Sequence, residues 1–383
     1  MRIAYICADP GIPVFGSKGA SIHAQAVLTE LTDRGHEVHL LTPRPAGTSP
    51  VITVHTLPAV GRGDTAERER AAQASDAAVA AVLDAIEPDL VYERYSLWGV
   101  TATRWADEHQ VPSILEVNAP LVEEQTTFRE LVDRTTAEQV ARSALSRAGA
   151  VVCVSDPVAD WARAQSTRPD RVHTLANGVD ITRITPPRRP VAPAAGADFT
   201  VGFVGTLKAW HGIEVLVAAM ARLLADDPTW RLLVVGDGPL RAEIERLAHQ
   251  LGIGKQTELT GAVAADGVAA QLHRMDIACA PYPQQDQCYF SPLKVYEYLA
   301  AGLPVVASAI GQIPEALDLG RLGRLVRPGD PAALADALRA LRLDEAERQA
   351  LRLSTRFAAV ERHTWSRVVD RALALVVPGV LVR

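Results

Sequence analysis

The amino-acid sequence predicts an α/β protein made of two doubly wound, Rossmann-like parallel-sheet domains. Short apolar runs alternate with amphipathic stretches in both halves of the chain. A proline-rich segment, residues 184–199, interrupts this alternation near the middle and is interpreted as a linker. The length of 383 residues also exceeds what one ordinary hydrophobic core supports, so two domains are expected.

The first domain is expected to cover residues 1–183. Its first helix is predicted over residues 21–36, with Ser21 as the N-cap and Gly35 as the glycine at its end. Further helical patterns separate the later strands, which is the β-α-β alternation of a parallel sheet. The strands of this domain are predicted at residues 2–7, 37–43, 88–95, 112–119 and 150–155.

The second domain is expected to cover residues 200–365, where the same alternation starts again. Ligands of open parallel sheets bind beyond the carboxyl ends of the strands, so a cleft between the two domains is the predicted ligand site. The strands of this domain are predicted at residues 200–207, 231–239, 257–263, 276–282, 304–310 and 323–329.

Composition excludes several classes of protein. Hydrophobic residues at 48% and charged residues at 22% indicate a globular rather than a disordered chain, and the net charge of -6 argues against a general nucleic-acid binder. Four scattered cysteines without a C-x-x-C pair favour a reducing compartment and provide no metal site. No signal peptide or apolar run of ~20 residues is found, so a cytoplasmic protein without a transmembrane segment is expected. Peripheral membrane contact and the oligomeric state stay open.

Two glycine-containing loops follow predicted strands. The loop of residues 9–21 leads into the first helix and contains Gly16 and Gly19, so its backbone N–H groups could bind a phosphate; a plain surface loop is the alternative. The loop of residues 234–240 contains Gly236, for which a tight turn is the alternative to ligand binding, and Asp237, which could cap the next helix.

The segment of residues 205–214 follows the first strand of the second domain. It places Lys208 and His211 ahead of a helix, together with Gly205 and Thr206. A cation and a histidine at this edge of a sheet would suit a leaving diphosphate, whereas a solvated surface lysine is the ordinary alternative.

The segment of residues 289–308 contains two opposite charges in an otherwise apolar stretch. Pro292 is predicted at the first helical position, and the free N–H groups of Leu293 and Lys294 would face an anion together with the Lys294 ammonium. Glu297, one turn later, could accept hydrogen bonds from a ribose diol. The alternative is a Lys294–Glu297 surface ion pair, which would leave Ser291 and Pro292 unexplained.

With these motifs the chain resembles a family 4 glycosyltransferase of the GT-B fold. The likeness spans almost the whole chain in the expected order. The segments that match the family are GSKGAS, PDLVYERYS, LEVNAPLVEEQ, VCVSDPV, LANGVD, GFVGTLKAWHG, VVGDGP, SPLKVYEYLAAGLPVVAS and GQIPEAL.

The resemblance implies roles for individual residues. Glu297 matches the second acid of the family's E-x7-E motif and is expected to bind the donor ribose, while the first acid falls at Tyr289. The family's usual arginine and lysine align with Thr206 and His211, so either Lys208 or Lys294 is expected to neutralise the diphosphate. The donor-binding residues are Gly16, Gly19, Gly205, Thr206, Gly236, Ser291, Pro292, Leu293 and Glu297, and the acceptor-side residues are His23, Glu116 and Asn118.

The resemblance also implies a reaction. A sugar would pass from a nucleotide-diphosphate sugar, bound by the second domain, to an acceptor hydroxyl at the first domain, with retention of configuration and without a metal or other cofactor. Residues 366–383 would form a helix that crosses back to the first domain. The alternatives are a nucleotide-sugar epimerase or a phosphorylase on the same fold, or a non-catalytic nucleotide-sugar-binding protein.

Overall fold

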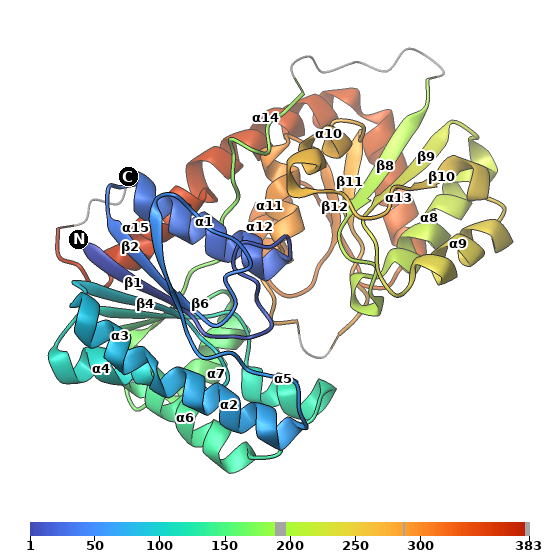
Figure 1. Cartoon of the computed structure of the whole chain (residues 1–383). Helices are drawn as coiled ribbons and strands as arrows, with labels where there is room; N and C mark the ends of the chain where they lie inside the picture. Colours follow the sequence, from blue (N-terminus) through green and yellow to red (C-terminus); the bar gives the residue numbers. More distant parts are fainter. Residues whose placement is uncertain (188–196, 286–287, 380–383) are drawn as a thin grey trace. The chain divides into compact units, whose positions relative to one another are not determined.

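The computed structural model describes residues 1–187, 197–285 and 288–379, and the chain forms two compact units (Figure 1). Unit 1 comprises residues 1–177, 289–291 and 365–383, and unit 2 comprises residues 178–288 and 292–364. Most of the predicted linker lies outside the described residues.

Unit 1 contains a seven-stranded parallel sheet with the order β3-β2-β1-β4-β5-β6-β7. The order reverses beside β1, as in a doubly wound fold. The strands are β1 (Arg2–Cys7), β2 (Glu37–Thr42), β3 (Ile52–Thr56), β4 (Leu90–Arg94), β5 (Ser113–Val117), β6 (Ala150–Cys153) and β7 (Val172–Thr174).

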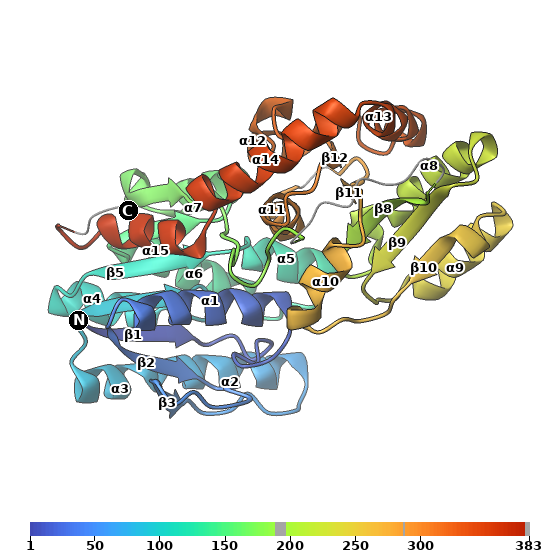
Figure 2. The same ribbon diagram turned by 90° about the horizontal axis from the view of Figure 1, so that it is seen from above.

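Helices cover both faces of this sheet. Helices α1 and α15 lie together over one face, and α2, α3, α4 and α6 cover the other (Figures 1 and 2). The helices of unit 1 are α1 (Gly19–Asp33), α2 (Thr65–Ala77), α3 (Val79–Ile86), α4 (Thr101–His109), α5 (Leu121–Phe128), α6 (Arg134–Arg147), α7 (Asp156–Gln165) and α15 (Trp365–Ala374), with a 3₁₀ turn η1 (Pro169–Arg171).

Unit 2 contains a six-stranded parallel sheet with the order β10-β9-β8-β11-β12-β13. Its order reverses beside β8, so the carboxyl ends of β8 and β11 flank the switch point where such sheets bind ligands. The strands are β8 (Phe199–Val204), β9 (Trp230–Val235), β10 (Thr257–Leu259), β11 (Ile277–Ala280), β12 (Val305–Ser308) and β13 (Arg324–Val326).

The helices of unit 2 also lie on both faces of its sheet. Helices α8, α9 and α13 cover one face, and α10 and α11 cover the other (Figure 1). The helices are α8 (Ile213–Asp226), α9 (Arg241–Gln250), α10 (Val268–Leu272), α11 (Leu293–Ala300), α12 (Ile313–Ala316), α13 (Pro331–Leu343) and α14 (Glu345–Arg362), with 3₁₀ turns η2 (Ala209–His211), η3 (Gly254–Gln256), η4 (Ala265–Gly267) and η5 (Asp318–Gly320).

The predicted fold class is confirmed, and the differences are local. Strands β3 and β7 were not predicted, because β3 is a half-exposed edge strand of mixed polarity and β7 has only three residues. Helix α1 begins at Gly19 with Lys18 as N-cap, so Ser21 lies inside the helix rather than at its cap. Gly35 does follow the end of α1 with a positive φ of 77°.

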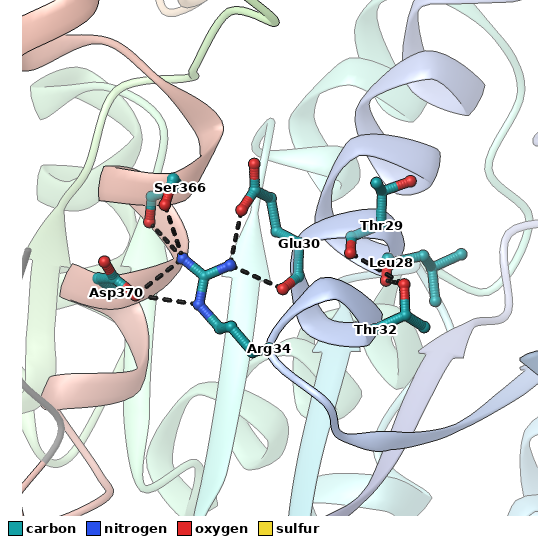
Figure 3. Close-up of polar contacts among 7 residues, drawn as sticks. All are labelled: Leu28, Thr29, Glu30, Thr32, Arg34, Ser366 and Asp370. Atoms are coloured by element: carbon teal, nitrogen blue, oxygen red, sulfur yellow. Dashed lines mark hydrogen bonds and ion pairs between the residues drawn. The ribbon is translucent and has the colours of Figure 1, made fainter. Parts of the chain in front are cut away.

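Arg34, directly after α1, joins that helix to the C-terminal helix α15 (Figure 3). Its guanidinium donates to Asp370 Oδ1 at 2.7 and 3.0 Å and to the Ser366 carbonyl at 2.8 Å, all on α15. It also donates to the Glu30 carboxylate of α1 at 2.6 Å. Asp370 is buried, so the guanidinium balances a charge that water does not reach.

We therefore expect Arg34→Met to lower the free energy of unfolding by about 2–4 kcal/mol, because it leaves the Asp370 carboxylate buried without a cation. Hydrogen exchange should show faster opening of α15 than of the sheet. Arg371→Met, which changes an exposed arginine of the same helix, is the control and should stay within ~0.5 kcal/mol. Equal effects of the two substitutions would contradict this role of Arg34.

Candidate functional site

Lys294 is a buried ammonium one residue inside the start of α11. Its Nζ lies 4.2 Å from the centre of the Phe203 ring and 5.0 Å from that of Tyr282. Gly205 approaches so closely that a Cβ on it would stand 3.1 Å from Nζ. Within the described ranges Nζ donates no hydrogen bond. Burial lowers the pKa of Lys294 to about 7, although the charge of Glu297 opposes this shift.

The start of α11 shapes the surroundings of Lys294. Helix α11 begins at Leu293 with Pro292 as N-cap, one residue later than the sequence predicts. Its first N–H groups are those that an α-helix leaves without intrahelical partners, and they add the positive end of the helix dipole to the Lys294 charge. Lys294 and the first turn of α11 thus place positive charge together, and anion binding there stays a prediction.

Glu297 pairs with Arg183 rather than with Lys294. Arg183 Nη2 donates to Glu297 Oε1 at 2.7 Å, and both side chains are about one-fifth exposed, at 22% and 21%. The i, i+3 ion pair with Lys294 is not the contact that holds this carboxylate. The sequence did not single out Arg183, because it lies 114 residues away along the chain.

The loop after β8 places His211 beside Lys294. His211 Nδ1 lies 2.5 Å from the Thr206 carbonyl oxygen, which can only accept, so Nδ1 carries the proton. Burial, together with the charges of Lys294 and Lys208, lowers the pKa of His211 to about 3. His211 is therefore a neutral imidazole with its Nε2 lone pair available. Lys208 lies over the ring of Trp210, 4.5 Å from its centre.

The glycines of this loop allow close backbone contact. Gly205 has φ 148° and Gly236 has φ 137°. A Cβ on Gly236 would lie 2.0 Å from the Gly205 carbonyl oxygen, so this close approach requires a glycine at position 236 whether or not it touches a ligand. Asp237 accepts from the Gly238 N–H at 2.8 Å, and α9 begins only at Arg241, so Asp237 does not cap that helix.

Residues 289–291 belong to unit 1, although they directly precede α11. The Tyr289 hydroxyl donates to Glu124 of α5, and the Tyr289 carbonyl accepts from the Ser155 hydroxyl. Ser291, a predicted donor-binding residue, accepts the Asn177 N–H through its Oγ at 3.2 Å. The tyrosine at the position of the expected first acid is thus hydrogen-bonded to a carboxylate from elsewhere in the chain.

The predicted loop glycines Gly16 and Gly19 lie before and at the start of α1. The Gly16 N–H donates to the Pro13 carbonyl at 2.8 Å, and its own carbonyl accepts from Gln25 Nε2 at 2.7 Å. Gly19 is the first residue of α1 and has open space where a Cβ would be. Gly19 therefore leaves the helix start accessible, whereas Gly16 is used in the packing of the loop.

The three predicted acceptor-side residues do lie together, around the carboxylate of Glu116. Oε1 of Glu116 lies 2.7 Å from Asn118 Nδ2, 2.9 Å from Arg94 Nη1 and 3.0 Å from His23 Nε2, while Oε2 accepts from the Tyr92 hydroxyl at 2.9 Å. Burial would raise the pKa of Glu116, but His23 and Arg94 lower it below its ordinary range. Burial lowers the pKa of His23. Arg94, Asn118 and Tyr92 thus hydrogen-bond this carboxylate, whereas the buried His23 Nε2 lies beside it and forms no hydrogen bond with the described residues.

A cavity of about 390 Å³ lies in unit 1 beyond the ends of β1, β4 and β5. The predicted acceptor-side residues do not line it. Glu124, the partner of Tyr289, does, and so does the buried Trp98. The cavity was not predicted. The pattern that could have indicated it is the position of polar residues directly after strands, such as Asp9 after β1. Its lining residues are Ala8, Asp9, Pro10, Gly11, Val60, Thr65, Arg68, Glu69, Ala72, Asp76, Ser96, Leu97, Trp98, Leu121, Glu124, Gln125, Arg129 and Glu130.

The described residues lack both a metal-binding cluster and a membrane-spanning helix. Residues 1–187, 197–285 and 288–379 contain no group of three or more His, Cys, Asp or Glu side chains that could hold a metal ion. In the same part of the chain, every helix is too short or too polar to cross a bilayer.

Two family models match the chain in sequence. Residues 17–183 match the model described as Glycosyltransferase Family 4, and residues 198–344 match Glycosyl transferases group 1. A D-inositol 3-phosphate glycosyltransferase of Corynebacterium efficiens is 28% identical over 91% of this chain and 88% of its own length. A phosphatidyl-myo-inositol mannosyltransferase of Mycobacterium leprae is 31% identical over 58% of this chain and 57% of its own length.

Solved structures share the fold. A sucrose-phosphate synthase from Thermosynechococcus elongatus superimposes with a TM-score of 0.75 and 21% identity, covering 98% of both chains. Anabaena HepE, solved in complex with UDP and glucose, gives a TM-score of 0.73 with 18% identity, also over 98% of both chains.

The burial of Lys294 leads to a prediction about stability. We expect Lys294→Met to raise the free energy of unfolding of the ligand-free protein at pH 7 by about 1–3 kcal/mol, because a buried charge with no hydrogen-bond partner among the described residues is replaced by an apolar chain of similar length. The folded-state pKa of about 7 lies below the unfolded value. The difference between variant and wild type should therefore be largest below pH 7 and shrink as pH rises toward ~10.

Denaturant unfolding across this pH range measures the effect. Lys208→Met is the matched control, since Lys208 is only partly buried and should change stability by no more than ~0.5 kcal/mol. A Lys294→Met protein less stable than wild type at pH 7 would contradict the unpartnered state of the ammonium.

Proposed function

Because the chain belongs to glycosyltransferase family 4, we propose that it transfers a sugar from a nucleotide-diphosphate sugar to an acceptor hydroxyl with retention of anomeric configuration. The observation that carries this proposal is the buried Lys294 ammonium at the start of α11, which has no hydrogen-bond partner among the described residues. A diphosphate supplies the negative charge that this ammonium lacks and can accept from the free N–H groups of the same helix turn.

Two side chains of opposite charge bind different parts of the donor. Lys294 and the first turn of α11 bind the diphosphate, and Glu297 accepts a hydrogen bond from the ribose. Lys208, at the carboxyl end of β8, adds a second cation on the same unit. His211 adds no positive charge to this site, because its lowered pKa of about 3 leaves the imidazole uncharged near neutral pH.

The reaction follows from these positions. The bond between the anomeric carbon and the diphosphate oxygen breaks, and the acceptor oxygen bonds to the same face of that carbon. The acceptor proton passes to the departing phosphate oxygen, so no protein carboxylate forms a covalent intermediate. The protein stabilises the charge that grows on the leaving group, and Lys294, Lys208 and the helix turn supply positive charge without a metal.

The acceptor binds at unit 1 in this proposal. The cavity of about 390 Å³ has room for a small polyhydroxylated molecule, and its lining combines carboxylates, two arginines and Trp98. D-Inositol 3-phosphate is a rational first candidate, because relatives such as that of Corynebacterium efficiens carry its name. Glu116 accepts hydrogen bonds from Arg94, Asn118 and Tyr92 and does not line this cavity.

The first test is incubation with radiolabelled UDP-glucose, UDP-N-acetylglucosamine and GDP-mannose, with and without D-inositol 3-phosphate. We expect transfer of label, or slow release of the free sugar without an acceptor, and equal rates with EDTA present. An isomerised donor would indicate an epimerase, and no turnover of any donor that binds would indicate a non-catalytic protein. Loss of turnover in EDTA that manganese restores would contradict the metal-independent mechanism.

The second test uses the pKa of Lys294, which burial lowers to about 7. UDP-glucose has no phosphate group that titrates near neutral pH, so its affinity reports on the protein. We expect its dissociation constant to rise about tenfold from pH 6 to pH 8, because only the protonated amine attracts the diphosphate. Calorimetry measures this change.

Lys294→Met should weaken binding and remove the pH dependence. Lys208→Met separates the two lysines, since it should keep the pH dependence even where it weakens binding. A wild-type affinity that stays constant from pH 6 to pH 8 would argue against Lys294 as the main phosphate contact.

A further inference from the structure

Helix α14, which runs along the outside of unit 2, has apolar residues on two faces (Figures 1 and 2). The first face packs against α11 and α13, and its buried residues include Leu351, Ala358 and Ala359. The second face is turned to solvent. It carries Leu353, which is 77% exposed, and Phe357, which is 65% exposed. A surface helix ordinarily has a single apolar face, so the second face indicates a further contact.

The apolar residues of this second face follow the spacing of a coiled-coil seam. They recur at intervals of four, three, four and three residues, which keeps their side chains along one line of the helix surface. A second helix can pack along such a line. We call this face the α14 stripe, and it consists of Ala346, Ala350, Leu353, Phe357 and Val360.

An apolar hollow adjoins the C-terminal half of the α14 stripe. It has a volume of about 390 Å³, and Leu353, Phe357 and Val360 line it. Pro186 and Gly302, from other parts of unit 2, form its opposite wall. In helix packing of the coiled-coil type, a side chain of one helix enters a hole between residues of the other. The hollow is therefore a place where a large side chain of a packing helix can insert.

The charges beside the α14 stripe favour a second copy of the same helix as its partner. Arg356 directly precedes Phe357, and Glu361 directly follows Val360, so these two charges occupy the flanking positions where coiled coils form interhelical ion pairs. When two copies lie parallel in the same register, Arg356 of one copy faces Glu361 of the other. An antiparallel pair would instead bring Glu361 towards Glu347 of the other copy, which is unfavourable.

Arg356 is suited to such a pair, because its hydrogen bonds go to neutral groups. Its guanidinium donates to the carbonyl oxygens of Ala300 at 2.8 Å, Ile184 at 3.0 Å and Ile181 at 3.3 Å. The mixture of arginines and glutamates along α14 also differs from the excess of positive charge in helices that bind anionic bilayers. A protein partner with the same mixed charges fits this surface better than a membrane.

We propose that two copies of this chain associate through the α14 stripe, with the two helices side by side and parallel. A seam of about two heptads is too short to hold two free peptides together, but α14 is already folded against unit 2, so association requires no helix formation. Leu353 and Phe357 are the large anchors of the contact, and Ala346 and Ala350 let the helices approach closely. No residue of the stripe belongs to the candidate functional site, so this inference does not depend on the proposed sugar transfer.

Sedimentation equilibrium of the full-length chain at several protein concentrations tests the association. The proteins are wild type, Leu353→Glu and Phe357→Glu, each of which sets like charges against each other in a symmetric pair. Phe128→Glu is the matched control, because Phe128 is 69% exposed on unit 1, outside the stripe. Circular dichroism and thermal unfolding confirm that each variant is folded.

We expect wild type to form a dimer, and each stripe substitution to raise the dimer dissociation constant at least about tenfold. Phe128→Glu should keep the wild-type constant. Because dimerisation stabilises only the folded chain, the Tm of wild type should rise with protein concentration, and that of Phe357→Glu should not.

A cross-linking experiment tests the parallel orientation. In a parallel pair the two copies of residue 346 lie opposite each other, so Ala346→Cys should form a disulfide-linked dimer on mild oxidation. Phe128→Cys, which is exposed outside the stripe, is the control and should stay monomeric on denaturing gels. If Ala346→Cys cross-links only when mixed with Val360→Cys, the helices are antiparallel and the proposed orientation is wrong.

Three further outcomes would overturn the inference. If wild type is a monomer at every concentration, two copies do not pair. If Leu353→Glu and Phe357→Glu both keep the wild-type dissociation constant, the dimer uses another surface. If a monomeric wild type instead sediments with vesicles of phosphatidylcholine and phosphatidylglycerol, and Phe357→Glu does not, the stripe contacts a membrane.

Discussion

The burial of the Lys294 ammonium, which has no hydrogen-bond partner in the described part of the chain, is the constraint around which the loops after β8 and β11 are arranged. Phe203 and Tyr282 place their rings against Lys294, and Gly205 lets the backbone after β8 approach it. Its charge also contributes to the lowered pKa of neighbouring His211. Aromatic faces attract a cation but do not replace the water that it has lost, so an incoming anion gains more here than at an exposed lysine.

Unit 1 contains the opposite case. Glu116 is equally buried, yet Arg94, His23, Asn118 and Tyr92 surround its two oxygens. A buried carboxylate whose two oxygens both accept hydrogen bonds from the protein has less to offer a ligand than a buried group without partners. The cavity of unit 1 is lined by other side chains, so the acceptor-side role of His23, Glu116 and Asn118 stays a prediction.

Much of the architecture could be predicted, because it depends on patterns within a few residues of each other. The predicted apolar runs form the central strands of both sheets, and Gly35 has the positive φ expected of a glycine that ends a helix. The edge strands β3 and β7 were not predicted, because an edge strand needs no continuous apolar run. Ser21 and Asp237 show that a residue suited to capping can lie inside a helix or before a turn instead.

The sequence by itself determined that Lys294 and Glu297 lie one turn apart at the start of a helix that follows a Ser-Pro pair. The spacing along a helix is local geometry and needs no other part of the chain. Only the tertiary structure decided that Lys294 Nζ has no hydrogen-bond partner among the described residues and that Glu297 pairs with Arg183. It also decided that Tyr289 is bonded to Glu124. These partners are separated by more than a hundred residues, and packing of the folded chain, rather than any local pattern, brings them within hydrogen-bonding distance.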